Sequence, residues 1–235
     1  MSLNQKLTFV DTTVTDSTGS GDVIDIGVLH RAAKLRMVVG ELEGESVRLA
    51  VYTSVDGVLW RERDGCDFVA PGATDLVAVD LDRYVKVVWM LAGPSTTIRV
   101  TGTAHQMFAT ARDLEALSLG PHVIARAESQ RVNRALIHGS DVAVGYLSSQ
   151  YTMPLRSWGD DLAGHTAAVV AYRFMSSIGY DPEGKDSNIR TMYEDAIRWF
   201  EKLAEGKMSP AEIVDSAPEV EVGRAIVYTR PTRGW

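Results

Sequence analysis

The sequence has little cysteine, no long apolar run and no basic block. Cys66 is the single cysteine among 235 residues, so no disulfide can form within the chain. No apolar run approaches the roughly 20 residues needed to cross a bilayer. The chain begins without a basic segment followed by an apolar core, so we expect no secretory signal. These absences predict a protein that is made and assembled in a reducing cytoplasm and has no membrane partner.

The charge is mildly negative along the whole chain, with a net value of −7 at pH 7. Subtracting acidic from basic residues gives −4 for residues 1–106 (10 and 14), −2 for 107–208 (11 and 13) and −1 for 209–235 (3 and 4). A nucleic-acid-binding protein needs clustered Lys and Arg to neutralise phosphates. We therefore expect that the protein does not bind DNA tightly.

Residue types with catalytic or metal-binding chemistry are present, but their spacing does not match a site. The five histidines never stand at metal-binding spacing, and His165 is interpreted as a packing or surface residue of a helix. Asp80 and Asp82 lack the rest of a calcium loop. Cys66 lies between acids, which raise a thiol pKa, and residues 19–22 (GSGD) favour a hairpin turn over a phosphate loop. We expect no enzyme activity, no cofactor and no metal.

Residues 1–106 have the pattern of β-structure. Residues 46–53 alternate between two faces, with Val47, Leu49 and Val51 on one of them. The Asp-Gly pair at 56–57 predicts a hairpin turn. About eight strands separated by turn residues predict an antiparallel sandwich of jelly-roll type. The expected strands are KLTFV, DVIDIGVL, KLRMVVGEL, SVRLAVYTS, VLWRER, DLVAVDL, YVKVVWML and TTIRVTGTA, and the expected turns are DSTGSGD, EGES, SVDG, DGCD, APGATD and AGPST.

Aromatic residues of the predicted strands raise an alternative function. Trp60, Trp89, Tyr52 and Tyr84 could line a carbohydrate-binding face, although tryptophans in strands more often fill a sandwich core. We interpret them as core residues. A carbohydrate- or receptor-binding sandwich with a helical anchoring domain stays as the first alternative, and a hydrolase with an accessory sandwich is the second.

After His105 the apolar period changes from 2 to 3.6 residues. Thr110 and Asp113 predict the start of a short helix. Three longer helices are expected from Ser129, over 159–178, and from about Ser187 to a glycine at 206. The sequence thus predicts an α+β protein with a β-sandwich domain over 1–106, a helical domain over 107–208 and an extended C-terminal arm over 209–235. The boundary falls at Thr103–Thr110, where we expect few strong apolar residues to bridge the two domains.

Arg173 lies near an apolar side of the third predicted helix. A buried guanidinium costs free energy unless it is paired. One alternative is that the long side chain of Arg173 extends to the edge of the apolar side and keeps its charge in water. The other, which we predict, is an ion pair between Arg173 and either Asp141 or Glu194 that fixes the register of the helices.

The segment that joins the predicted helix from Ser129 to the one over 159–178 contains Tyr-Thr-Met-Pro-Leu at 151–155. Pro154 removes a backbone donor and keeps the residue before it out of the helical conformation. We expect the apolar residues of this joint to pack back on the bundle, while Pro154 directs the next helix.

The C-terminal segment 209–235 has three prolines and one β-prone run, Ala225, Ile226, Val227 and Tyr228. This run would make a good added strand. We therefore predict an assembly arm that binds a neighbouring subunit or a partner protein, with a tail folded back on its own bundle as the alternative.

Four segments occur in a telling order: MFATARDLEAL, GYLSSQYTMPL, AAVVAYRFM and YEDAIRWFEKLAEGKMS. Together they resemble the family of head–tail connector (adaptor) proteins encoded beside capsid genes in Mu-like prophages. The resemblance covers roughly residues 107–210. Two positions differ from the family pattern: Gln150 replaces the usual Arg before Tyr151, and Phe200 replaces the usual Leu after Trp199. The matching residues are Tyr146, Leu147, Tyr151, Thr152, Pro154, Leu155, Arg173, Tyr193, Glu194, Asp195, Ala196, Trp199, Gly206 and Lys207.

The resemblance implies a homo-oligomeric ring, commonly of twelve copies, at the virion neck. Such a ring lies beneath the portal protein and joins the head to a tail completion or stopper protein, while DNA passes through without specific binding. Assembly would take place in the host cytoplasm. The sandwich is not part of this resemblance and is only weakly similar to β-modules of phage structural proteins, through Ser54, Asp56, Gly57 and Trp60.

Overall fold

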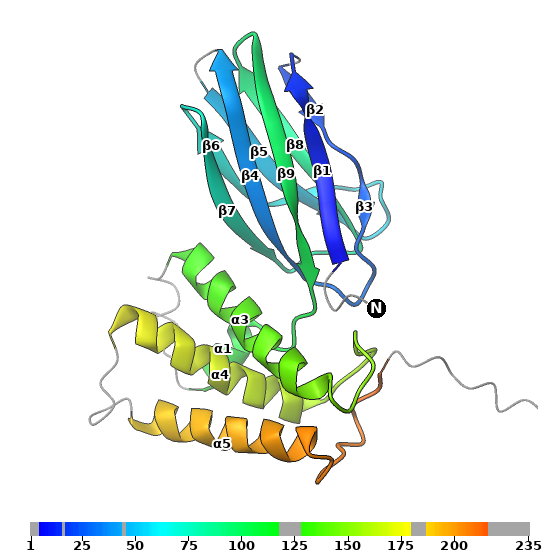
Figure 1. Cartoon of the computed structure of the whole chain (residues 1–235), viewed down its shortest axis with the longest axis vertical. Helices are drawn as coiled ribbons and strands as arrows, with labels where there is room; N and C mark the ends of the chain where they lie inside the picture. Colours follow the sequence, from blue (N-terminus) through cyan, green and yellow to red (C-terminus); the bar gives the residue numbers. More distant parts are fainter. Residues whose placement is uncertain (1–4, 16, 44–45, 118–127, 180–186, 216–235) are drawn as a thin grey trace, which may run out of the picture.

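A computed structural model describes residues 5–15, 17–43, 46–117, 128–179 and 187–215. Strands form the first part of the chain and helices the second, which confirms the predicted α+β class (Figure 1). The strands are β1 Gln5–Val14, β2 Thr18–Ser20, β3 Ile24–Asp25, β4 Ala32–Glu43, β5 Ser46–Ser54, β6 Arg61–Phe68, β7 Gly72–Val79, β8 Tyr84–Ala92 and β9 Ser95–His105. The helices are α1 Ala111–Ala116, α3 Ser129–Leu147, α4 Asp160–Ile178 and α5 Ser187–Ala204.

Two antiparallel sheets make the sandwich. One has the order β1-β9-β4-β7, and the other has the order β2-β8-β5-β6 with β3 paired to β8. From β7 onward each strand lies in the sheet opposite to the preceding strand. Such crossings between two sheets are what a jelly-roll pattern requires.

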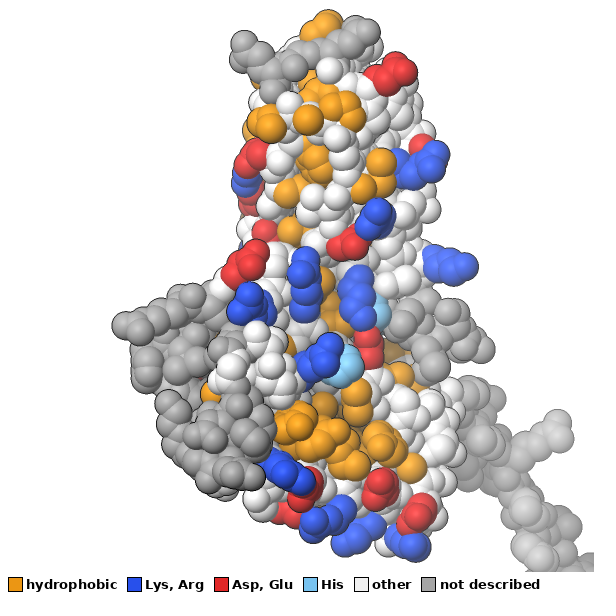
Figure 2. Space-filling model, turned by 60° about the vertical axis from the view of Figure 1, so that its left-hand side comes forward, with side chains coloured by type: hydrophobic (Ala, Val, Ile, Leu, Met, Phe, Trp, Pro, Cys, Tyr) orange, Lys and Arg blue, Asp and Glu red, His pale blue; other side chains and the backbone are white. Residues whose placement is uncertain are grey.

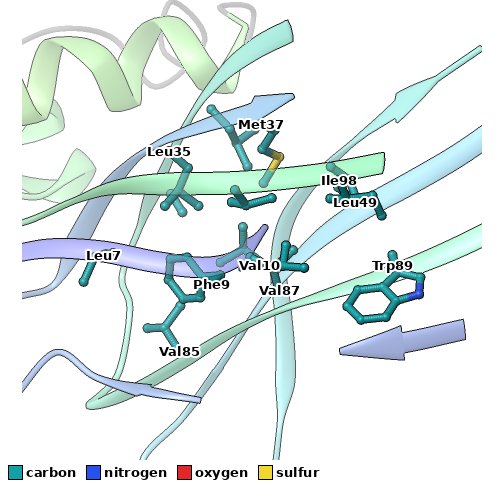
Figure 3. Packing of buried hydrophobic residues seen from close by; sticks show 14 of the residues in the cluster. Leu7, Phe9, Val10, Leu35, Met37, Leu49, Val85, Val87, Trp89 and Ile98 are labelled. Atoms are coloured by element: carbon teal, nitrogen blue, oxygen red, sulfur yellow. The ribbon is translucent and has the colours of Figure 1, made fainter. Parts of the chain in front are cut away.

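Apolar side chains of both sheets fill the space between them. Figure 3 shows Ile98 of one sheet beside Leu49 of the other, and Leu35 and Trp89 belong to the same buried cluster. The predicted inward face of β5 is confirmed, because its three valine and leucine residues are fully buried. Trp89 is only 8% exposed, so its interpretation as a core residue is confirmed.

Several segments predicted as turns lie partly or wholly in strands, among them APGATD, of which residues 72–75 begin β7. The GSGD segment begins within β2, where a side chain at Gly19 would overlap the Trp89 indole, so it is not a hairpin turn. The DGCD segment lies inside β6, with Cys66 opposite Leu49 in β5. Gly65 permits this pairing because it leaves room for the carbonyl oxygen of Leu49. Close backbone approach, rather than a turn, is the reason for both glycines. The expected strand over 22–29 shrinks to β3.

The helical pattern is confirmed at the predicted positions. Asp113 accepts hydrogen bonds from the backbone N–H and the hydroxyl of Thr110 at 2.7 and 2.8 Å, which satisfies the start of α1. Gly206 follows α5 with a φ of +68°, as expected of a glycine that ends a helix. None of the helices in the described part of the chain is both long and apolar enough to span a bilayer.

The joint between sandwich and bundle is more apolar than the sequence suggests. Ala32 and Val77 of the first sheet share one buried cluster with Met107, Val132 and Leu136 of the helical part. The expectation that few apolar residues bridge the boundary is therefore wrong. The change of period at the boundary is in the right place, because β9 ends at His105 and α1 begins at Ala111.

Side chains of α3 also satisfy the edge of the sheet. The N–H of Val77 in edge strand β7 donates to the Gln130 amide oxygen at 2.8 Å, and the Val77 carbonyl accepts from Asn133 at 3.0 Å. A bare edge strand exposes backbone groups that can pair with another chain. Here α3 occupies part of that edge, which fixes the bundle against the sandwich.

Helices α3 and α4 pack closely at Gly139. A methyl group at this position would overlap a Val170 methyl and approach the Thr166 carbonyl oxygen to 3.3 Å. We predict that Gly139→Ala lowers the free energy of unfolding by about 1–3 kcal/mol, because the stiff valine cannot move away. Chemical denaturation of the full chain measures the change.

Gly145→Ala is the matched control on the same helix, since an added methyl there meets no atom within 4 Å. It should raise the free energy of unfolding by about 0.5–1 kcal/mol through helix propensity alone. Equal effects of the two variants would contradict tight packing at Gly139.

Candidate assembly site

The residues that carry the sequence resemblance lie mostly in one apolar core at the end of the bundle. Tyr146 stacks on Phe200 with 5.7 Å between ring centroids, and Leu147 is fully buried beside them. The buried members of this core are Phe108, Ala143, Leu147, Met153, Leu155, Leu162, Ala168, Val169, Ala196, Phe200, Leu203 and Ile213. The motif thus specifies a packed core that joins α3, α4 and α5.

The Tyr-Thr-Met-Pro-Leu joint packs on the bundle as predicted. Met153 and Leu155 are buried in this core, and Tyr151 is half-buried against it. Pro154 is half-buried between them and precedes the start of α4. The joint is therefore a fixed part of the bundle.

Gln106 fastens the joint to the end of β9. Its amide oxygen accepts the backbone N–H of Leu155 at 2.9 Å, and its amide nitrogen donates to the Leu155 carbonyl at 2.5 Å. Gln106 and Leu155 are both buried, so water cannot replace these bonds. Sequence reasoning missed Gln106, and its one signal was a polar residue directly before an apolar run.

The α5 residues of the motif also have structural contacts. Trp199 stacks on His165 at 4.5 Å, and Tyr193 stacks on Tyr172 at 4.3 Å. Burial lowers the pKa of His165, which confirms its interpretation as a packing residue. Glu194 pairs with Arg190 at 2.8 Å and lies 3.8 Å from Arg198, and Asp195 pairs with Arg198 at 3.2 Å on the exposed face.

The predicted ion pair of Arg173 is wrong. Asp141 instead binds Lys34 at 2.6 Å and His105 at 2.8 Å, and Glu194 binds arginines of its own helix. Arg173 is exposed near the end of α4, where its long side chain reaches past the apolar core. It lines a surface pocket with Arg131, Arg134 and His138.

Asp141 links α3 to two strands of the sandwich. Lys34 belongs to β4, and His105 ends β9 and also bonds the Thr103 hydroxyl through its second ring nitrogen at 2.8 Å. Burial alone would raise the pKa of Asp141. The hydrogen bonds from His105 and Lys34 outweigh burial, so the pKa of this carboxyl is lowered.

The first residues of the predicted arm are attached to the same joint. Ile213 is buried in the bundle core, and the carbonyl of Val214 accepts the Arg156 N–H at 2.7 Å. The Asp215 carboxylate accepts the backbone N–H of Thr152 at 2.9 Å. The chain therefore stays on the bundle to Asp215, past the predicted boundary at 208. The strand-prone residues Ala225, Ile226, Val227 and Tyr228 lie outside the described residues.

The residues considered for other chemistry have ordinary partners. Asp82 pairs with Arg61 at 2.8 Å and Asp80 with Arg63 at 3.5 Å. In the described part of the chain, no three His, Cys, Asp or Glu side chains come together as a metal would require. Burial, followed by the neighbouring aspartates, raises the pKa of Cys66 to about 11, so its thiol is a poor nucleophile.

Of the four aromatic residues interpreted as core residues, Trp89 is buried, whereas Tyr52, Trp60 and Tyr84 are half-buried, so the interpretation is wrong for these three. The Lys86 ammonium lies 4.2 Å from the centroid of the Trp60 ring. Tyr52 donates to Glu62 at 3.0 Å, and the Arg83 guanidinium lies 5.0 Å from the Tyr84 ring centroid. Each of the three half-buried rings thus has a charged partner.

Comparison with family models assigns the helical part. Residues 93–226, more than half of the chain, match the family described as Bacteriophage Mu, Gp36. The chain belongs to this family. The match to Gp36 starts before β9 and therefore extends further toward the N-terminus than the motifs over 107–210.

No curated protein matches the sequence. Similar solved structures include the PBSX exported protein XepA, which is 12% identical over 44% of this chain and 38% of that chain, with a TM-score of 0.37. Tripeptidyl peptidase 2 is 7% identical over 47% of this chain and 11% of that chain, with a TM-score of 0.35. A structure titled "CBM4 structure and function" is 12% identical over 43% of this chain and 70% of that chain, with a TM-score of 0.27. This chain thus spans less than two thirds of the first two, and likenesses at such TM-scores carry no argument about function.

We predict that Gln106→Ala lowers the free energy of unfolding by about 2–4 kcal/mol. The variant leaves two buried backbone groups of Leu155 unpaired and opens a cavity. Gln150→Ala is the control, because Gln150 is exposed and bonds only the Ala204 carbonyl among the described residues. Its effect should stay within about 0.5 kcal/mol, and a Gln106→Ala change as small as that would contradict the fastening role.

The lowered pKa of Asp141 predicts a pH dependence. A carboxyl whose pKa is lower in the folded than in the unfolded chain adds stability above its unfolded pKa of about 4. That contribution disappears as the pH falls through the folded value. Asp141→Asn should therefore be less stable than the wild type at pH 7, and the difference should shrink as acid is added. Denaturant titrations from pH 7 to pH 3 measure it, and a constant difference would contradict the shift.

Proposed function

We propose that this protein is a head–tail connector, a structural protein that forms a ring at the phage neck between the portal and a tail completion or stopper protein. The observation that carries the proposal is membership of the Gp36 family over residues 93–226. Membership suggests a phage structural or morphogenesis protein and hence a virion component. The connector role itself rests on the motif resemblance.

The contacts of the motif residues support a structural role. Tyr146, Leu147, Leu155 and Trp199 all contribute to the packed core of the bundle. A ring subunit needs such a rigid body, because a flexible one would have to lose conformational entropy in every contact with a neighbour. The proposal includes no enzymatic activity, no cofactor and no metal.

The C-terminal arm is part of the proposal. Its first residues are fixed on the bundle up to Asp215 through Ile213 and Val214. The strand-prone residues 225–228 follow at a short distance along the chain and would pair with a neighbouring subunit or a partner by strand addition. DNA would pass through the ring without specific binding, since the net charge of −7 repels phosphates.

We predict that the purified full chain forms closed rings of a single multiplicity, expected to be twelve, either alone or on addition of the portal protein of the same phage. Electron microscopy and light scattering after size-exclusion chromatography measure ring size and mass. The rings should bind the portal and remain intact with duplex DNA. A monomer with and without portal would contradict the proposal, and so would binding of an oligosaccharide array in place of the portal.

A further inference from the structure

Basic side chains gather at one pocket between α3 and α4. The pocket measures about 390 Å³ and is lined by Glu128, Arg131, Arg134, His138, Arg173 and Ser177. Figure 2 shows Lys and Arg side chains gathered between the sandwich and the lower helices. This basic pocket departs from the sequence expectation that the chain has no basic cluster.

The fold builds the basic pocket from residues that are distant in sequence. Arg131, Arg134 and His138 follow one face of α3 at helical spacing, and Arg173 comes from α4. Burial and then the charge of Arg173 lower the pKa of His138, which agrees with their proximity. Among the ion pairs of the described residues, none engages Arg131 or Arg173. The pocket therefore offers two guanidinium groups to an external oxyanion.

An acidic pocket lies elsewhere on the same bundle. It measures about 330 Å³, and its lining includes Asp160 and Asp161 at the start of α4 and Asp195 of α5. Asp195 already pairs with Arg198, whereas no ion pair among the described residues engages Asp160 or Asp161. Two carboxylates are thus available to an external cation.

The two pockets face opposite directions from α4. Gly164 and Ala168 line the acidic pocket, and Arg173 and Ser177 line the basic one. Arg173 follows Gly164 by nine positions, and Ser177 follows Ala168 by nine positions. Nine positions are about two and a half turns of an α-helix. The two sets of residues therefore lie on opposite sides of the helix. A closed ring is built from such a pair of different, complementary surfaces that point away from each other.

We propose that the basic pocket of one copy binds Asp160 and Asp161 of the next copy, so that these two surfaces form the repeating contact of the ring. The inference rests on the proposed function and names its subunit interface. Guanidinium groups bind carboxylates through paired hydrogen bonds, and a pocket of this size holds two carboxylate side chains. The net negative charge of the chain repels the densely charged phosphates of a duplex more than it repels two carboxylates, which favours a second copy as the occupant.

Charge reversal of each surface tests the proposal. Arg131→Glu with Arg173→Glu should weaken ring formation by at least about tenfold in the concentration required, and so should Asp160→Lys with Asp161→Lys. An equimolar mixture of the two variants should form rings again. In the mixture, every contact joins copies of different kinds, so the rings contain alternating copies and an even total number. Size-exclusion chromatography with light scattering and electron microscopy give the readout, with portal present if the wild type requires it.

The controls separate the contact from general effects of charge and folding. Arg36→Glu with Arg99→Glu changes the charge by the same amount at exposed positions of the sandwich and should leave the rings unchanged. All variants are compared with the wild type by circular dichroism and thermal melting. Lysines at the start of α4 oppose the helix dipole, so Asp160→Asn with Asp161→Asn provides a second variant, which should also weaken the rings.

Each outcome decides a different point. Rings of wild-type stability from both reversed variants would overturn the proposed contact and leave the connector function in place. Loss of rings without rescue in the mixture would show that the two surfaces do not meet and would also overturn it. Duplex DNA binding by the wild type that is lost in Arg131→Glu with Arg173→Glu would assign the pocket to DNA instead. A wild type that forms no rings under any condition would refute the proposed function itself, and the contact with it.

Discussion

The arrangement of the whole chain depends on polar groups buried at the end of β9. His105 bonds Asp141 of α3, and Gln106 bonds both backbone groups of Leu155 in the joint before α4. Because unpaired polar groups are costly in a buried site, these bonds allow few other positions of the helices relative to the sheet. An apolar cluster that includes Ala32, Val77 and Leu136 also spans this joint, whereas the buried bonds specify its geometry. β9 is therefore both a central strand of its sheet and the point from which the bundle is oriented.

This dependence explains why the family motif and the apparent functional residues coincide with a core. Tyr146, Leu155 and Trp199 do not surround a reaction centre in the structure. They hold three helices and a connecting joint in one body, so that surfaces on opposite sides of α4 keep a constant relation. In a protein that works through contacts with copies and partners, such constancy takes the place that a reactive group has in an enzyme. A fixed relation between surfaces requires tight packing, and the motif residues are those that provide this packing.

Elements with a regular apolar period were predictable, and elements created by tertiary pairing were not. The helices α3 and α5 and the inward face of β5 followed from periodicity, because each buries one continuous stripe, and α4 followed from an apolar pattern on most of its sides. β2 and most of β6 contain glycine and aspartate, which favour turns locally. They become strands because Trp89 and the backbone of Leu49 come close to Gly19 and Gly65. No local pattern contains that information.

The candidate site divides in the same way. The motif residues were found from the sequence because they are linked by helical spacing and by a resemblance. The basic pocket was not found, since Arg131 and Arg173 are far apart along the chain and meet only when α3 packs on α4. Arg173 was assigned to the interior because helical spacing gives the direction of a side chain and says nothing of how far it extends beyond the core. The spacing also gave no indication that Asp141 was already bound by two residues of the sandwich.

The attachment of the C-terminal segment has a mechanical consequence. Val214 is hydrogen-bonded to the backbone of Arg156 and Ser157. Leu155, which directly precedes Arg156, is hydrogen-bonded to Gln106 at the end of β9. A pulling force on the segment beyond Asp215 would thus pass through a few short hydrogen bonds into β9, which has neighbours on both sides in its sheet. The load would therefore be divided between the bundle, through Ile213 and α5, and the two ladders of backbone bonds that hold β9 in its sheet.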